Sequence, residues 1–261
     1  MARHTVAIIQ FSPIEYDVIP FRYFIVALNR VQSTYEFSFP DIEVSLESRE
    51  FTEEELLASL DSINETLSPA FEYVIAVVSR PIQGNLFFTS RGKVTAITTD
   101  TWESYFSPPS LFEYVLHCIA ASLLFLHPAL DLDSHFDTRG CVLDYTRRKT
   151  DDRIDIALGY ICDSDCEKIK RHIGEDYLEQ MQLVVSRKWI GSVSERNSVA
   201  YDLKHFFRFD IERDSGLNKT FWERTRSKLD DVPLEVVKLV LNGMMTVLLA
   251  ILLLVLGLKK D

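Results

Sequence analysis

Three cysteines in the second half of the chain have a spacing that suits metal binding. Cys162 and Cys166 form a C-x3-C pair, and Cys141 lies far enough upstream to close a long loop. They would form a tetrahedral zinc site if Cys118 or a histidine such as His117 supplied the fourth ligand. In an alternative interpretation the cysteines are small buried residues near a strand end and a helix start, because cysteine is among the most buried residue types.

An acidic loop lies just before Cys141. Its side chains could bind a cation, although such a cluster is typical of a solvated loop; they are Asp131, Asp133, His135 and Asp137. The sequence contains no glycine-rich phosphate loop, no G-x-S-x-G motif and no clear Cys/His dyad. It therefore predicts metal binding more clearly than it predicts an enzyme.

Strand and helix patterns place these residues in an α/β domain. A buried strand at Thr5–Phe11 is followed by a helix after Pro20 and by a capping-box helix at about Thr52–Leu67. A β-branched strand at Tyr73–Val78 and a hairpin at Leu86–Thr98 come next. This order predicts an α/β (α+β) fold with a mixed sheet and packed helices.

The second half of the chain has a mainly helical pattern. An apolar helix at Leu111–Leu126 carries His117 and Cys118, and helical patterns resume from Glu167. No Pro/Gly-rich linker separates the two parts. We therefore predict one α/β domain over residues 1–230, with a helical subregion at about 167–230.

The apolar helix and the cysteines together resemble the layout of the archaemetzincin branch of the metzincin zinc metalloproteases. That family has an HExxHxxG active-site helix, a C-x-M turn and a closing CxxC pair. In this chain His117 matches the second zinc histidine, and Cys141-Val142-Leu143 matches the turn. Cys162 and Cys166 match the closing pair with one extra residue. The resemblance covers roughly residues 71–166 and implies a metzincin-like fold.

The same helix departs from the metzincin motif at three positions. Glu113 stands where the first zinc histidine should be, and Tyr114 stands where the general-base glutamate should be. Ala120 replaces the glycine. Without the histidine pair and a carboxylate to deprotonate a metal-bound water, the hydrolytic mechanism loses its ligands and its base. We therefore expect a pseudoenzyme with no catalytic residues.

The C-terminal stretch predicts a membrane anchor. Leu239–Leu258 is an uncharged apolar run that as a helix would span about 30 Å, the thickness of the hydrocarbon core of a bilayer. We expect a juxtamembrane linker at 231–238, a transmembrane helix at 239–258 and a tail at 259–261. Because no signal peptide is evident, the chain would be tail-anchored. It would be a single-pass protein of the cell membrane with its bulk in the cytoplasm, where the cysteines stay out of disulfides.

Small and polar residues within this stretch permit close approach of helices in lipid. They are Asn242, Gly243, Thr246 and Gly257. This pattern predicts a homo-oligomer in the lipid bilayer. Alternatively, these residues lie near a helix end and are simply tolerated at the membrane interface.

The charge balance excludes one class of partner. A net charge of -11 and a pI of about 5.1 argue against nucleic acid. The leading hypothesis is a non-catalytic sensor domain that binds a protein partner or a small ligand and controls oligomerisation of the span. By analogy, membrane-disrupting effectors of bacterial antiviral defence have this layout. The alternatives are a membrane-tethered zinc metallohydrolase that uses His117, and a passive membrane scaffold.

Overall fold

The computed structural model describes most of the chain. The described residues are 3–45, 50–102, 108–137, 139–148 and 151–217, together with 245–246, 248–249 and 251–252. The chain divides into two units, Met1–Lys219 and Thr220–Asp261. The first unit contains the sheet and the candidate sites.

Among the described residues, the first unit is built on a six-stranded mixed sheet. The strand order is β2-β1-β4-β6-β5, and β3 pairs with the end of β1. Neighbouring strands are parallel except for β5 and β6, which form an antiparallel hairpin. The strands are β1 (His4–Ser12), β2 (Tyr35–Ser38), β3 (Val44–Ser45), β4 (Tyr73–Val78), β5 (Phe88–Arg91) and β6 (Val94–Thr98).

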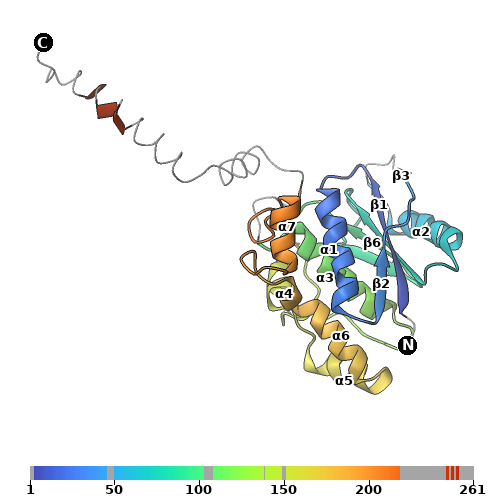
Figure 1. Cartoon of the computed structure of the whole chain (residues 1–261). Coiled ribbons are helices and arrows are strands. Elements are labelled where there is room, and N and C mark those ends of the chain that lie inside the picture. Colours follow the sequence, from blue (N-terminus) through green and yellow to red (C-terminus); the bar gives the residue numbers. More distant parts are fainter. Residues whose placement is uncertain are drawn as a thin grey trace, which may run out of the picture. The chain divides into compact units, whose positions relative to one another are not determined.

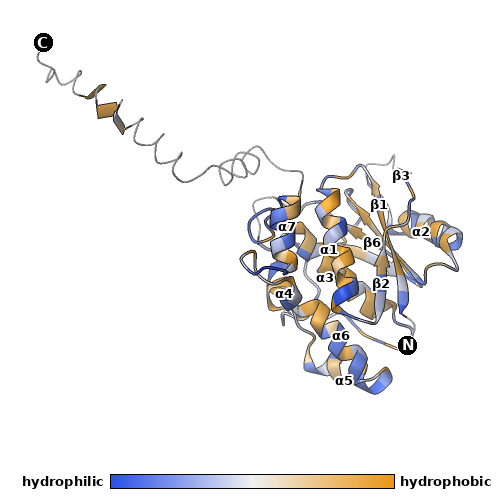
Figure 2. Ribbon diagram, viewed as in Figure 1, coloured by the Kyte–Doolittle hydropathy of each residue, from blue (hydrophilic) through white to orange (hydrophobic). Residues whose placement is uncertain are grey.

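Helices cover both faces of this sheet (Figure 1). Helix α2 (Glu53–Leu67) packs on one face, and α1 (Val18–Val31) and α3 (Leu111–Leu126) pack on the other. Successive side chains of a strand point to opposite faces, so Ile8 joins the core with α1 and α3, whereas Ile9 joins the core with α2. The central strands are therefore almost continuously apolar, as Figure 2 shows by their orange colour.

Helix α3 is buried on every side. All of its residues are buried except Glu113 and Phe125. The helix begins at a capping box, in which the Ser110 hydroxyl accepts a hydrogen bond from the Glu113 backbone N–H and the Glu113 carboxylate accepts one from the Ser110 N–H. Such a helix needs apolar cover on the side that faces away from the sheet.

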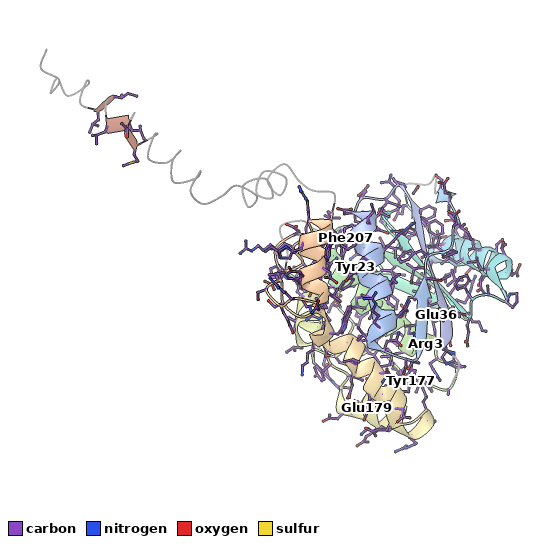
Figure 3. All side chains as sticks on the ribbon, viewed as in Figure 1. Arg3, Tyr23, Glu36, Tyr177, Glu179 and Phe207 are labelled. Carbon is purple, nitrogen blue, oxygen red and sulfur yellow. The ribbon has the colours of Figure 1, made fainter. Side chains whose placement is uncertain are left out.

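The segments that follow α3 supply this cover. Phe209 stacks on Phe112 of α3 with ring centroids 4.3 Å apart. Tyr23 of α1 and Phe207, both labelled in Figure 3, have ring centroids 4.7 Å apart. The helices of this layer are α4 (Arg153–Leu158), α5 (Asp163–His172), α6 (Glu175–Ser186) and α7 (Val199–Phe207), with a 3-10 turn at Lys188–Ile190.

The structure contradicts the transmembrane helix predicted at 239–258. Among the described residues, no helix combines the length and the apolar character needed to cross a membrane. A span needs about twenty consecutive apolar helical residues. Helix α3 is apolar but has 16 residues, and it belongs to the core of the first unit.

The fold class is therefore corrected to mixed α/β without an assigned transmembrane helix. The tail-anchored, single-pass arrangement at the cell membrane is corrected with it. Within the predicted span, residues 245–246, 248–249 and 251–252 are described as helical. The remaining span residues, among them Asn242, Gly243 and Gly257, lie outside the described residues, as does the predicted linker at 231–238.

The burial of α3 predicts a large difference between two isoleucine substitutions. Ile119 of α3 is 0% exposed, whereas Ile19 of α1 is 67% exposed. Ile119→Ala should lower the free energy of unfolding by about 2–5 kcal/mol, because it leaves a cavity in the core. Ile19→Ala, the matched control, should change it by less than about 0.5 kcal/mol. Urea denaturation measures both, and equal effects would contradict the placement of α3.

Candidate metal centre

Four side chains from two segments of the chain bring metal-ligating atoms together. They are the imidazole of His135, the thiols of Cys141 and Cys162, and the carboxylate of Asp165. One donor atom from each lies within 4.8 Å of the donor atoms of the other three. This group could hold a metal ion.

A short bridge between two backbone segments positions the cysteines. Cys141 pairs with Tyr160, and the Val142 N–H donates to the Tyr160 carbonyl at 3.0 Å. Cys162 is the N-cap residue of α5, and its backbone N–H points at the Cys141 sulfur, 3.4 Å away. Asp165 follows three residues later in the first turn of α5, which puts its carboxylate on the same side as the Cys162 thiol.

A tight loop brings His135 to the same place. The His135 N–H donates to the Leu143 carbonyl at 3.0 Å, and the Tyr145 N–H donates to the His135 carbonyl at 2.7 Å. The Asp144 carboxylate closes the loop from inside, because its Oδ2 accepts hydrogen bonds from the backbone N–H groups of Gly140 and Cys141 at 2.6 and 3.1 Å. The chain between His135 and Tyr145 is therefore held by its own backbone and by one carboxylate.

The distances distinguish this group from a catalytic triad. His135 Nε2 lies 2.8 Å from Asp165 Oδ2 and 3.3 Å from Cys162 Sγ. Cys162 Sγ and Asp165 Oδ2 are themselves 3.2 Å apart. In a triad the nucleophile and the carboxylate contact different ring nitrogens. Here both face the same nitrogen, so the three atoms surround a single point, as metal ligands do.

This group is largely shielded from water. Cys141, Cys162 and Asp165 are buried, and His135 is largely buried. Burial raises the pKa of the Cys141 thiol to about 12. Asp165 Oδ1 has no hydrogen-bond partner among the described residues, and the nearest ammonium, that of Lys168, is 3.9 Å away. Buried carboxylates and thiolates are stabilised by coordination to a cation.

The structure groups two of the five metal ligands predicted from sequence. Cys141 and Cys162 meet in the centre. The Cys166 thiol instead donates to the Ile161 carbonyl at 3.3 Å, and Cys118 is buried within α3. Neither these two sulfurs nor His117 belongs to the group of converging donors among the described residues.

His135 and Asp165 belong to the converging group but were not predicted as zinc ligands. His135 was expected in a cation-binding or solvated acidic loop, but its neighbours Asp131 and Asp133 are not part of the converging group. Asp165 stands at the third position after Cys162, where a C-x2-C zinc motif would have its second cysteine. Reading aspartate as a ligand at that position would have been the available signal.

The positions that depart from the metzincin motif have structural contacts in this fold. Glu113 caps α3 and forms a largely buried ion pair with Arg187. Tyr114 stacks on Trp102 with ring centroids 4.7 Å apart and donates to the Thr98 carbonyl at 3.0 Å. Neither side chain belongs to the converging group of metal ligands.

A second group of polar side chains lies close to His117. The Nε2 atom of His117 is 3.9 Å from Asp152 Oδ1, and burial lowers the pKa of the His117 imidazole to about 4. Burial also raises the pKa of the Asp155 carboxyl to about 7, and the nearby carboxylates of Asp152 and Asp144 add to this shift. His117 is therefore neutral at pH 7, and Asp155 is partly protonated.

No protein-family model matches the chain, and no curated protein matches it in sequence. The geometry of the metal centre and of the polar group near His117 therefore carries the functional argument.

The Glu113–Arg187 pair predicts a stability effect that an exposed pair should not show. The two side chains are 12% and 17% exposed. Glu113→Gln keeps a capping side chain but leaves the Arg187 charge buried without its partner, so the free energy of unfolding should fall by about 2–5 kcal/mol. Glu54→Gln is the matched control, because Glu54 is 81% exposed in its pair with Arg91; it should cost less than about 1 kcal/mol. Similar losses in urea denaturation would contradict a structural role for Glu113.

The raised pKa of Asp155 predicts that the variant Asp155→Asn is more stable than the parent protein by an amount that depends on pH. The folded pKa is about 7 against an ordinary value of 3.8, so the folded chain binds more protons than the unfolded chain between these values. The stability from protonated Asp155 is therefore complete below about pH 4 and lost as the pH rises through about 7. Asparagine stays neutral, so the free energy of unfolding of the variant should exceed that of the parent protein by an amount that grows with pH to about 2–4 kcal/mol.

Urea denaturation of both proteins at about pH 5 and about pH 8 measures this difference. Asp137→Asn is the control, since Asp137 is exposed. A constant difference between Asp155→Asn and the parent protein at both pH values would contradict the interpretation.

Proposed function

We propose that the Met1–Lys219 unit is a non-catalytic binding domain stabilised by one structural zinc ion. The ligands would be His135, Cys141, Cys162 and Asp165. The observation that carries this proposal is the convergence of four buried donor atoms from two chain segments within 4.8 Å.

The donor set favours zinc among the biological metals. Thiolates are soft ligands, whereas magnesium and calcium take oxygen ligands almost exclusively. Two cysteines with one histidine and one carboxylate are ligand types that zinc accepts in a tetrahedral arrangement. Donor atoms about 3–4 Å apart, as found here, fit around an ion with bonds of about 2.0–2.3 Å.

The number of protein ligands favours a structural role. A catalytic zinc site keeps one coordination position open for water or substrate, whereas a structural site is closed by four protein ligands. All four positions would be filled here by buried or largely buried side chains. His117 has Asp152 near it, but no third histidine, cysteine or acidic donor atom among the described residues completes a group there. The non-catalytic hypothesis is therefore preferred to a metallohydrolase.

The ion would fasten the loop that carries His135 and Cys141 to the first turn of α5. Metal binding of this kind contributes directly to folding, because the unfolded chain has no preformed site. The same loop lines a cavity of about 200 Å³, together with α3. The metal ion would therefore hold one wall of this cavity in place, which favours a binding role for the domain.

Metal content tests the proposed ligand set. The purified full chain should contain about one zinc ion per chain by elemental analysis. Cys162→Ala and Asp165→Asn should each reduce the zinc content and lower the thermal midpoint, because each removes a ligand. Cys166→Ala is the matched control: Cys166 is the other member of the C-x3-C pair but lies outside the group, so the variant should keep its zinc.

Cobalt substitution covers the case in which a ligand variant fails to fold. The parent chain loaded with Co²⁺ should show the absorption bands of a tetrahedral site with thiolate ligands. A parent chain that binds neither zinc nor cobalt would overturn the proposal. Loss of zinc in Cys166→Ala together with retention in Cys162→Ala would overturn the ligand assignment.

A further inference from the structure

A cavity of about 200 Å³ lies between α3 and the loop that carries two of the metal ligands. Helix α3 contributes His117 and Phe125, and the loop contributes Leu143 and Thr146. Sites for drug-sized ligands typically have volumes of roughly 300–1,000 Å³, so this cavity suits a smaller molecule.

His117 is a buried polar side chain that makes no hydrogen bond to another described residue. It is 8% exposed and lines the cavity. Its closest acidic atom, Asp152 Oδ1, is 3.9 Å away, beyond hydrogen-bonding distance. Buried polar groups in native proteins nearly always have a partner, and one without a partner needs an explanation. A ligand in the cavity would supply the missing hydrogen bond.

The charge of the cavity wall is one-sided. The described residues that line the cavity include Asp144 and Asp152 but no lysine or arginine. Burial keeps the His117 imidazole neutral, so this side chain adds no positive charge to the wall. Buried carboxylates are stabilised by a nearby positive charge, so this wall favours a cationic ligand.

Another part of the cavity wall is aromatic and apolar. Phe88 and Phe125 have ring centroids 6.1 Å apart, and Phe87 and Leu143 also line the cavity. Aromatic rings accept apolar bodies and also attract cations to their faces. A bare metal ion would not use this wall, and among the described residues no third metal-ligating atom joins His117 and Asp152.

We propose that this cavity binds a small organic cation, with an ammonium or amidinium group beside Asp152 and His117 and a compact apolar body against Phe88 and Phe125. This inference rests on the proposed function, because the loop that forms one wall is the segment that the zinc ion would hold. The imidazole of His117 would accept a hydrogen bond from the cation, and the carboxylates would compensate its charge. No covalent step is involved.

A series of probes that differ in charge tests the inference. Phenethylamine, phenethyl alcohol and phenylacetate share an aromatic ring and differ at the polar end. Isothermal titration calorimetry with the full chain should show one-to-one binding of phenethylamine, at least about tenfold tighter than that of the alcohol. Phenylacetate should bind more weakly still. Equal binding of all three probes, or binding of none, would overturn the inference.

Two aspartate variants locate the site. Asp152→Asn should weaken phenethylamine binding by about tenfold or more, because it removes the carboxylate beside His117. Asp151→Asn is the matched control, since Asp151 is the preceding residue and does not line the cavity. Unchanged binding in Asp152→Asn would overturn the site. If that variant fails to fold, the charge series on the parent chain decides the question alone.

Zinc content measured on the same samples separates this inference from the proposed function. A chain that contains zinc but binds no probe would overturn the cavity assignment and leave the zinc site standing. A chain without zinc that still prefers phenethylamine would support the cavity assignment and overturn the structural zinc.

Discussion

The near-complete burial of α3 is the constraint on which the rest of the first unit depends. One side of the helix packs on β5 and β6 of the sheet, and the other side needs a second layer. The segments from α4 to Phe209 provide that layer. Each polar group on α3 must then find a partner inside the protein. Glu113 pairs with Arg187, and the Ser122 hydroxyl donates to the Cys118 carbonyl at 2.6 Å. Among the described residues His117 makes no such bond, and it lines a cavity.

Much of the sheet could be predicted from local sequence patterns. The predicted strands at Thr5–Phe11 and Tyr73–Val78 correspond to β1 and β4, and the capping box at Thr52 opens α2 as expected. These elements are encoded by neighbouring residues, so a single sequence suffices. The length of an apolar stretch was a less specific signal of where a helix lies. It correctly indicated the buried helix α3, but it predicted a transmembrane helix at 239–258 that the described residues do not support.

Only two of the four residues in the candidate metal centre were predicted as zinc ligands, because only the cysteines stand out in the sequence. Cys141 and Cys162 are conspicuous as cysteines, but a cysteine pair four residues apart on a helix need not point both sulfurs at one site. Cys162 is the N-cap residue of α5, and its thiol points toward the loop. Cys166 lies within α5, and its thiol donates a hydrogen bond to the Ile161 carbonyl, just before the helix begins. Asp165 completes the group from the same turn. This selection depends on how the loop docks on α5, which spacing alone does not encode.

Asp144 connects the two candidate sites. One carboxylate oxygen holds the backbone of Gly140 and Cys141, and thereby the position of a metal ligand, while the residue itself also lines the cavity. Leu143 also belongs to both sites, because its carbonyl accepts a hydrogen bond from the His135 N–H and the residue lines the cavity. Metal and ligand would therefore share one loop. Ordering that loop by either one lowers the conformational entropy that the other must remove, so their binding should be positively coupled.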